Sequence, residues 1–332
     1  MSAATEKSAP IGETVASAYR TIGNEIAGLQ LMSEAFAGAL GATFAAVVDL
    51  MRAARGRVVI SGIGKSGHIG SKMAATFAST GTPAFFVHAS EASHGDLGMI
   101  TTDDVVLALS WSGESSELAS VIAYTRRFAV PLVAITSSAA STLGRAADHV
   151  LELPRAEEAC PHGLAPTTST TMQLALGDAL AIALLEARGF TALDFRIYHP
   201  GGKLGASLKL IRDVMHGNDR MPLVDIATPM GEALLAMTAK GFGVVGVRDG
   251  DGRLIGIVTD GDLRRHLSPD LIYLKVEEVM TANPKTLRPD TLVGTAIDMM
   301  NRKGITSIFA VDDDHRPVGF VHMHDLVRIG AV

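Results

Sequence analysis

The sequence has a single cysteine, no excess of basic residues and no long apolar run. Cys160 cannot form an internal disulfide, which fits a reducing compartment. The 332 residues carry 29 basic and 35 acidic side chains, a formal net charge of −6, whereas nucleic-acid-binding surfaces are basic. No stretch approaches ~18 consecutive apolar residues, and the N-terminal segment lacks the apolar core of a signal peptide. We therefore expect a soluble, cytoplasmic protein that binds neither nucleic acid nor a membrane.

The first part of the chain alternates between patterns typical of helices and of strands. Helical spacing predicts a helical lead-in over residues 1–56. Strands are then predicted at 57–60, 84–87, 105–109, 132–135 and 150–153, and helices at 66–79, 115–128 and 167–188. This alternation indicates a three-layer α/β domain over 57–205, in which a parallel sheet is covered by helices on both faces. The turns at 61–67, 88–96 and 110–117 would meet at the carboxyl edge, where such sheets bind ligands.

The second part of the chain contains an internal repeat. Two pairs of segments match, RDVMH at 212–216 with EEVMT at 277–281, and GIVTDGDLR at 256–264 with GFVHMHDLV at 319–327. Each copy also encloses two short strands and one helical pattern, at 232–240 or 294–303. We expect two α+β modules over 212–270 and 276–332, separated from the first domain at the HPGG segment, 199–202.

A hydroxyl-rich turn follows the apolar run at 105–109. It reads SWSGESSE and supplies the hydroxyls of Ser110, Ser112, Ser115 and Ser116. A turn between a buried strand and a helix start offers free backbone N–H groups and the positive end of the helix dipole. Such groups bind a phosphate monoester, and Glu117 would lie close to whatever carries the phosphate. The segment therefore predicts a phosphosugar-binding protein.

The GIGKSG segment at 62–67 matches the glycine pattern of dinucleotide-binding turns. A dinucleotide fold also needs a carboxylate at the end of its second strand, and here none occurs until Glu91. A phosphate-binding P-loop is excluded because Val59 stands where its leading glycine belongs. We therefore expect this turn to bring Lys65, Ser66 and backbone N–H groups to a sugar phosphate. The alternative is a plain tight turn with Lys65 in solvent.

Two histidines, His88 and His94, flank the turn after the second predicted strand. They suggest a metal, but no cysteine or carboxylate pair shows ligand spacing. Neutral imidazoles that hydrogen-bond sugar hydroxyls are the favoured interpretation, and incidental surface histidines are the alternative.

An acidic segment, EEACP at 157–161, precedes a run of hydroxyl residues that opens a long helix. A glutamate here could reach the pocket as a proton shuttle, or the segment could be an acidic loop followed by helix caps. Cys160 has no recognisable base beside it, and we interpret it as a packing residue.

Taken together, these motifs resemble the arabinose 5-phosphate isomerase family. Residues 57–202 resemble a sugar isomerase (SIS) domain, and 212–332 resemble a pair of CBS (cystathionine-β-synthase-type) modules. The segments that carry the resemblance are GIGKSGHIG, HGDLGM, SGESSE, EEACPHGLAPTTSTT and HPGGKLG. The resemblance implies interconversion of D-arabinose 5-phosphate and D-ribulose 5-phosphate. The aldose would serve the synthesis of 3-deoxy-D-manno-octulosonate, a lipopolysaccharide sugar.

The resemblance also implies site residues. The family's functional positions fall on Lys65, Glu117, Glu158 and His199, and its substrate-contacting segment matches Gly81, Thr82, His88 and His94. It further implies that His88 accepts an inhibitory zinc ion and that the protein is a homotetramer with pockets completed across subunits. One departure is Trp111, where asparagine is expected, and this indole would either narrow the pocket or pack sideways.

Aldose–ketose isomerisation through an enediolate needs a carboxylate near the carbon and a cation or donor near the developing oxyanion. Lys65 would supply the charge, and His199 would relay protons between oxygens or open a cyclic sugar. The carbon base stays open among Glu117, Glu158 and Glu91. No cofactor is required, because the two carbons exchange oxidation level internally. The rival functions are a phosphosugar-sensing regulator and an isomerase for another sugar phosphate.

The first repeat copy has residues that CBS modules use to bind a ribose and phosphate. These are Thr259 and Asp262, and Thr228 and Glu278 occupy other ligand positions of the family. In the second copy, His322 replaces the hydroxyl although Asp325 is retained. We expect a nucleotide or nucleotide-sugar that relies on the first copy, and the alternative is a pair that only builds oligomer contacts.

Overall fold

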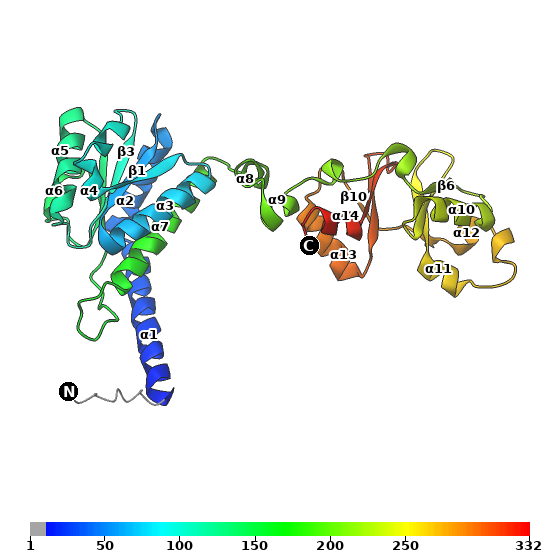
Figure 1. The fold of residues 1–332 in the computed structure, drawn as a ribbon, viewed down its shortest axis with the longest axis horizontal. Coiled ribbons are helices and arrows are strands. Elements are labelled where there is room, and N and C mark those ends of the chain that lie inside the picture. Colours follow the sequence, from blue (N-terminus) through cyan, green and yellow to red (C-terminus); the bar gives the residue numbers. More distant parts are fainter. Residues whose placement is uncertain (1–10) are drawn as a thin grey trace, which may run out of the picture. The chain divides into compact units, whose positions relative to one another are not determined.

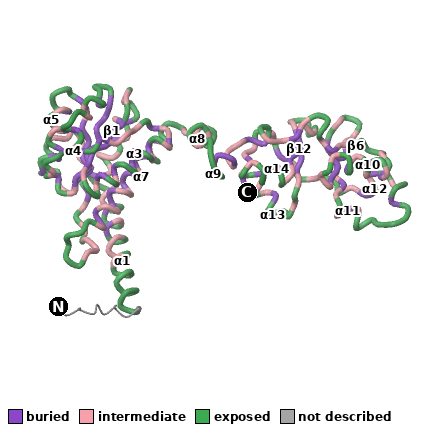
Figure 2. Tube along the Cα trace, in the orientation of Figure 1, coloured by how far each residue is buried: buried purple, intermediate pink, exposed green. Residues whose placement is uncertain are grey.

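A computed structural model describes residues 11–332, which divide into two units between Phe195 and Arg196 (Figure 1). Each unit buries its own apolar clusters, as the purple segments of Figure 2 indicate.

The first unit is built on a five-stranded sheet with the strand order β2-β1-β3-β4-β5. The strands are β1 (Val58–Gly62), β2 (Ala84–His88), β3 (Val105–Leu109), β4 (Leu132–Thr136) and β5 (His149–Glu152). All neighbouring pairs are parallel, which confirms the predicted sheet. Each strand lies within a residue or two of its predicted bounds, because its apolar run is what the sheet buries.

Helices cover both faces of this sheet, so the three-layer prediction is confirmed. One face packs against α1 (Ile11–Ala35), α2 (Ala39–Ala53), α3 (Gly64–Ser79) and α7 (Thr168–Ala187). The other packs against α4 (Ala89–Ala92), α5 (Ala119–Phe128) and α6 (Thr142–Ala146). Alternate strand residues face opposite layers: Val58 and Ile60 join the first cluster, whereas Val59 joins the second. Burial of both faces explains why the strands are continuous apolar runs.

The helical predictions differ from the structure in three places. The lead-in is two helices, α1 and α2, bent by 78° at the short break after Ala35. The helix predicted from residue 115 starts as a 3₁₀ turn (Ser116–Leu118) and becomes α5 only at Ala119. The helices α4 and α6, and a 3₁₀ turn over Asp96–Met99, were not predicted because they are too short to show a helical period.

The helix α7 is long and apolar enough to cross a membrane, but half of its apolar window is buried inside the first unit. Its residues Met172, Leu176, Leu180 and Leu184 are fully buried in the cluster that α1, α2 and α3 share with the sheet. This burial is that of a core helix.

The second unit contains the two repeat copies and a short helical lead-in. Its helices are α9 (Gly202–Ser207), α10 (Met230–Lys240), α11 (Asp260–Arg265), α12 (Val276–Val279), α13 (Val293–Lys303) and α14 (Met323–Arg328), and α8 (Ala192–Tyr198) spans the division between the units. Its 3₁₀ turns are Ile211–Asp213, Asn218–Arg220 and Leu271–Tyr273. One sheet joins β6 (Leu223–Asp225), β7 (Val244–Arg248), β8 (Leu254–Thr259) and β9 (Thr281–Ala282), and the other joins β10 (Thr286–Leu287), β11 (Ser307–Val311) and β12 (Pro317–His322). The helices predicted in each copy correspond to α10 and α13.

The repeat copies exchange their first segments. Val214 and Met215, from the first segment of copy one, pack in the core of the second module. Val279 and Met280, from the first segment of copy two, pack in the core of the first. A Cβ on Gly319 would overlap Met215, just as one on Gly256 would overlap Met280. Each module therefore completes its core with the first segment of the other repeat copy.

Candidate active site

The carboxyl ends of β2, β1 and β3 lie side by side at one edge of the sheet. His88 and Leu109, the last residues of β2 and β3, are both register partners of Gly62, the last residue of β1. The turn that carries Lys65 therefore adjoins residues 110–117, which we call the serine turn. This is the ligand-binding edge that the parallel topology predicted.

The serine turn is stabilised by its own hydroxyls. Ser110 is buried, and its Oγ lies 2.9 Å from Ser115 Oγ and accepts the Gly113 N–H at 3.0 Å. Gly113 has a φ of +71°, in the left-handed region that favours glycine. Ser112 and Ser116 are exposed and Ser115 is half-buried. Ser112 Oγ also accepts the Glu114 N–H at 3.2 Å. The buried Ser110 hydroxyl therefore only shapes the turn, whereas the other three keep surface that a ligand can reach.

A second hydroxyl-rich loop, absent from the predicted site, packs against the serine turn. It follows β4 and reads TSSAAST at 136–142. The Glu114 carboxylate accepts the Thr142 N–H at 2.9 Å and its hydroxyl at 2.6 Å, and these bonds lower the pKa of Glu114. The sequence does carry a signal for this loop, because its hydroxyl residues directly follow an apolar run that ends at the same edge.

Lys65 and Glu117 are both exposed at this edge. Lys65 lies in the first turn of α3, directly after the β1 turn. Glu117 lies in the 3₁₀ turn that leads into α5, and its carboxylate accepts the Ser116 hydroxyl at 3.3 Å. The turns after the adjacent strands β1 and β3 thus carry an ammonium and a carboxylate to the same edge of the sheet.

Trp111 packs sideways, one of the two outcomes expected for it. Its half-buried indole contacts the cluster shared by α1, α2, α3 and α7. Its carbonyl oxygen accepts the Ser137 N–H at 2.9 Å and the Ser137 hydroxyl at 2.8 Å, which fixes the backbone.

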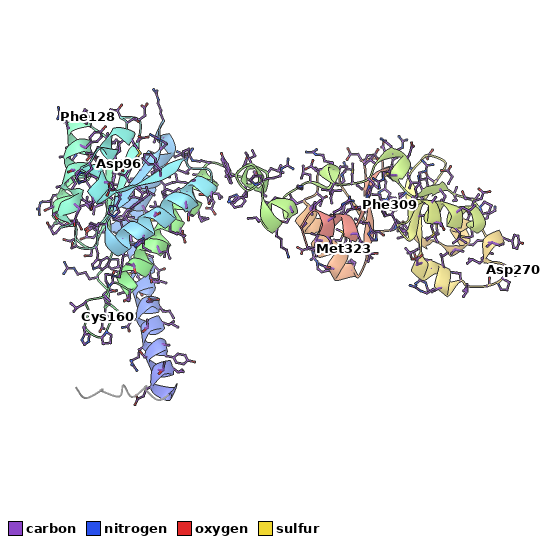
Figure 3. The ribbon with its side chains drawn as sticks, in the orientation of Figure 1. Asp96, Phe128, Cys160, Asp270, Phe309 and Met323 are labelled. Atoms are coloured by element: carbon purple, nitrogen blue, oxygen red, sulfur yellow. The ribbon has the colours of Figure 1, made fainter. Side chains whose placement is uncertain are left out.

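Glu158 caps the helix α7. It lies on the long loop between β5 and α7, the loop on which Figure 3 labels Cys160. Its Oε2 accepts the Thr167 N–H at 2.7 Å, the Thr167 hydroxyl at 2.9 Å and the Ser169 N–H at 3.4 Å. Partial burial raises the pKa of this carboxyl, but the hydrogen bonds from Ser169 and Thr167 outweigh it, so the pKa lies below its usual value. One oxygen of Glu158 is therefore engaged at the N-terminus of α7.

The histidines at the β2 end are exposed, as is Glu91. The His88 Nδ1 accepts the Ser90 N–H at 3.3 Å and caps α4. Within residues 11–332, no group of three or more His, Cys, Asp or Glu side chains could hold a metal ion.

Two predicted residues are not brought to the serine turn. Gly81 and Thr82 precede β2 and therefore lie at the amino edge of the sheet, opposite the serine turn. Gly81, at a φ of +88°, packs so closely on Phe190 that a Cβ would lie 2.5 Å from the ring. His199 belongs to the second unit, so it is not placed relative to the sheet.

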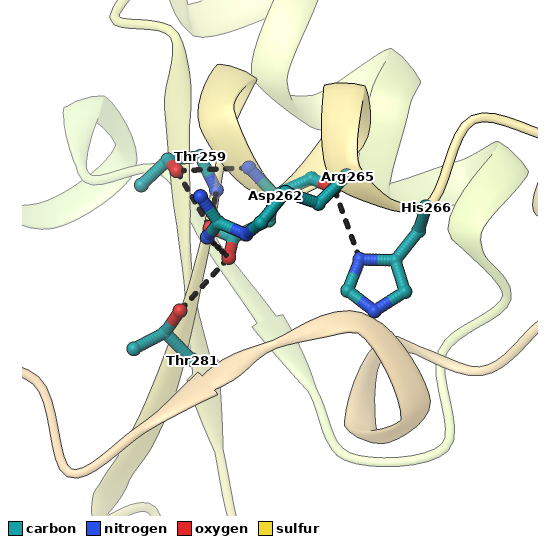
Figure 4. Close-up of polar contacts among 5 residues, drawn as sticks. All are labelled: Thr259, Asp262, Arg265, His266 and Thr281. Atoms are coloured by element: carbon teal, nitrogen blue, oxygen red, sulfur yellow. Dashed lines mark hydrogen bonds and ion pairs between the residues drawn. The ribbon is translucent and has the colours of Figure 1, made fainter.

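The predicted ligand residues of the CBS modules separate into two groups. Thr259 lines a cavity of about 620 Å³ between the two modules, whereas Thr228 and Glu278 do not line it and bond locally to Asp225 O and Lys275 N. Asp262 is buried. It accepts bonds from Thr259, Thr281 and Arg265 (Figure 4). Burial raises the pKa of Asp262, but the hydrogen bonds that its carboxylate accepts outweigh burial, so the pKa lies below its usual value.

Comparison with known proteins agrees with this architecture. The SIS domain model matches residues 50–183, and the CBS domain model matches residues 211–269 and 276–331. A parallel sheet with a hydroxyl-rich turn at its carboxyl edge, followed by a CBS pair, thus defines the class: an SIS-domain protein with CBS modules.

Relatives narrow this class. The chain is 49% identical over 319 residues to arabinose 5-phosphate isomerase KdsD of Pseudomonas aeruginosa, and the aligned region covers 95% of this chain and 97% of that protein. It is 52% identical over 281 residues to KdsD of Escherichia coli K12, covering 84% and 85%. A solved Escherichia coli CFT073 protein, c3406 in complex with arabinose 5-phosphate, matches with a TM-score of 0.54 and 41% identity over 58% of this chain and all of that chain. The chain belongs to the arabinose 5-phosphate isomerase family.

Proposed function

We propose that this protein interconverts D-arabinose 5-phosphate and D-ribulose 5-phosphate through an enediolate. The observation that carries the proposal is the serine turn, which lies beside the Lys65 turn at the carboxyl edge of the sheet. Relatives of about half-identical sequence over most of the chain bear the isomerase name, which supports the same reaction here. The aldose produced would supply 3-deoxy-D-manno-octulosonate synthesis for lipopolysaccharide.

The exposed groups of this edge match the needs of the reaction. The hydroxyls of Ser112, Ser115 and Ser116 would hold the phosphate, and Lys65 would face the developing oxyanion. A preorganised donor at that position is worth about 3–4 kcal/mol of barrier lowering. His199 would relay the proton between the oxygens. No cofactor enters the scheme, because the carbons exchange oxidation level between themselves.

Among the three candidate carboxylates, we favour Glu117 as the carbon base. It would take the C2 proton of the aldose and return it to C1, while a proton moves from the C2 oxygen to the C1 oxygen. Glu117 is exposed on the serine turn itself, whereas one oxygen of Glu158 is occupied as a helix cap. Glu91, exposed beyond β2, is the third candidate.

Incubation of the protein with ribulose 5-phosphate, with identification of the product, tests the reaction. Arabinose 5-phosphate is the expected product, and another sugar phosphate or no turnover would refute the proposal. The second outcome would favour the sensing regulator. In tritiated water, label should enter the carbon-bound position, and its absence would indicate a hydride shift instead.

Paired variants test the choice of base. Glu117→Gln should lower kcat by roughly 10²–10⁴-fold with little change in the free energy of unfolding. Glu158→Gln should lower that free energy by about 1 kcal/mol, because an amide caps a helix N-terminus less well than a carboxylate. Near-native turnover of Glu117→Gln would contradict our choice and return the role to Glu158 or Glu91.

We also propose a cytoplasmic homotetramer. The exposed side chains of Val15, Tyr19, Ile22 and Ile26 recur on α1 at the four–three spacing of a helix–helix seam. The N-terminal part of α1 extends beyond the sheet (Figure 1). Such a seam suits pairing with another copy, which would complete the sites of its neighbours. An added zinc ion at His88 would inhibit turnover, and a His88→Asn variant should be insensitive to it.

The CBS pair, in this proposal, binds a nucleotide or nucleotide-sugar in the cavity between the modules. Its lining combines apolar side chains such as Phe242 and Ile257 with the hydroxyl of Thr259 and the cations Arg264 and Lys285. Apolar walls suit a base, and the hydroxyl and cations suit a ribose and phosphate.

A further inference from the structure

The cavity between the CBS modules lies next to two polar centres related by the internal repeat. In the first, which we call the threonine centre, Asp262 accepts the hydroxyls of Thr259 at 2.6 Å and Thr281 at 2.8 Å. Thr259 and Thr281 both line the cavity. Arg265 also pairs with the Asp262 carboxylate, and His266 Nδ1 lies 3.0 Å from the Asp262 carbonyl oxygen, but neither side chain lines the cavity. The groups that this centre presents to the cavity are therefore hydroxyls, which do not titrate near neutral pH.

In the second, the histidine centre, imidazoles replace both hydroxyls. Asp325 lies 2.9 Å from the Nε2 of His216 and accepts the backbone N–H of His322 at 3.2 Å. The repeat aligns His216 with Thr281 and His322 with Thr259. His216 is 9% exposed, whereas His322 lines the cavity. One wall of the cavity can therefore gain a proton in the range where histidine titrates, and its counterpart cannot.

The surroundings of His322 disfavour its protonated form while the cavity holds no anion. Its Nδ1 accepts the His324 N–H at 3.2 Å, so a proton on this nitrogen would break the cap of α14. The two rings stack with centroids 5.0 Å apart. Burial lowers the pKa of His322. The nearby imidazoles of His324 and His216 lower it further, and the Asp325 carboxylate raises it, so that the pKa of His322 stays below its usual value.

The remaining charged groups around His322 favour an anion in the cavity. Arg264 and Lys285 line it as cations, and Asp260 is its acidic residue. On α14, Arg328 pairs with Asp325, which leaves less of that carboxylate's charge to compensate an imidazolium. A phosphate group in the cavity would supply the negative charge that a protonated His322 needs.

We propose that the cavity between the CBS modules is a proton-linked anion site, in which a phosphate-bearing ligand binds together with one proton taken from solvent by His322. The inference rests on the ligand-binding role proposed above for the CBS pair and adds its control by pH. Binding then strengthens as the pH falls, by up to about tenfold per pH unit while one proton is taken up.

Calorimetric titration of the full-length protein with AMP, between about pH 6 and pH 8, tests the linkage. Measurement in two buffers of different ionisation enthalpy gives the number of protons taken up. The informative variant is His322→Thr, which copies the threonine centre and retains a side chain able to cap α14. The AMP phosphate also titrates near pH ~6. Its protonation is common to both proteins, so their difference isolates His322.

The wild type should take up more protons than His322→Thr and show the steeper pH dependence. His315→Asn, which removes an exposed histidine from a hairpin of the same unit, should match the wild type. Equal proton uptake by the wild type and His322→Thr would overturn the proposal. The proposal would also be overturned if AMP, ATP and pyrophosphate all failed to bind at both ends of the range, about pH 6 and about pH 8. Turnover of ribulose 5-phosphate by the wild type, without nucleotide, reports on the isomerase separately, so the two failures are distinguishable.

Discussion

The substitution Gly113→Ala tests whether the serine turn is set by its contact with the loop after β4. Gly113 has a φ of +71°, and a Cβ there would overlap the side chain of Ser141 and lie 3.0 Å from Thr136 Oγ1. Ser141 cannot yield freely, because its hydroxyl accepts the Gly144 N–H at 3.1 Å as the cap of α6 and donates to Ser138 O at 2.7 Å. Alanine therefore combines backbone strain with displacement of a helix cap.

The expected cost follows from these two effects. A non-glycine residue in the left-handed region costs roughly 1–2 kcal/mol, and loss of a serine cap costs about 1 kcal/mol. We expect the free energy of unfolding to fall by about 2–3 kcal/mol, measured by urea denaturation. Displacement of the turn should also misplace its phosphate-binding hydroxyls. Because hydrogen bonds to charged groups contribute about 1.5–3 kcal/mol each, the KM for the sugar phosphate should rise at least about tenfold.

A matched variant separates strain from overlap. Gly189 has a φ of +64°, and nothing lies within 4 Å of the position its Cβ would take. Gly189→Ala should therefore carry only the backbone cost of roughly 1–2 kcal/mol and leave the KM unchanged. If Gly113→Ala were no less stable than Gly189→Ala and kept the native KM, the turn would not depend on its contact with Ser141, and the reasoning would be refuted.

Two further predictions concern buried contacts. Asp104 is buried and accepts the Arg57 N–H at 2.6 Å and the Thr101 N–H at 2.8 Å; burial raises its pKa, but these bonds hold it below the usual 3.8. The stability that Asp104 contributes should thus be present above that pH and lost as the pH falls below it. Asp104→Asn should lower the free energy of unfolding by about 2 kcal/mol at neutral pH and make it less sensitive to acid. The same loss of stability in acid for the variant and the wild type would contradict this. In the second unit, Gly319→Ala should cost about 1–3 kcal/mol by overpacking against Met215, and Met215→Ala in the same chain should relieve part of that cost; strictly additive effects in urea denaturation would argue against the contact.

The sheet and its ligand-binding edge were predictable because both depend on local apolar runs. A strand such as β3 is buried on both faces, so five consecutive apolar residues mark it without any knowledge of its neighbours. Parallel order then follows from the intervening helices, and it places every strand's carboxyl end at one edge. This is why the serine turn and Lys65 were expected together, and why they are found on adjacent strands.

The parts of the site that the sequence did not predict depend on contacts between distant residues. The Glu114 carboxylate reaches Thr142, and the Glu158 carboxylate reaches Thr167, across loops whose paths no periodic pattern encodes. The Ser110 hydroxyl was expected to bind phosphate, but it bonds to its own turn. Hydroxyl residues in a turn identify the kind of ligand, whereas the division between hydroxyls that hold the turn and those that hold the ligand requires the folded backbone.

The CBS pair shows how a non-local contact can change the chemistry that a repeat encodes. Each copy contributes one histidine and one threonine. The first copy carries His216 and Thr259, and the second carries His322 and Thr281. Modules formed from contiguous sequence would place one histidine in each centre. Because the first segments are exchanged, His216 crosses to Asp325, 109 residues away, and joins His322. The exchange thus gathers both imidazoles in the histidine centre, where His322 lines the cavity, and leaves threonine hydroxyls at the equivalent positions of the threonine centre. This is the asymmetry that a proton-linked site requires.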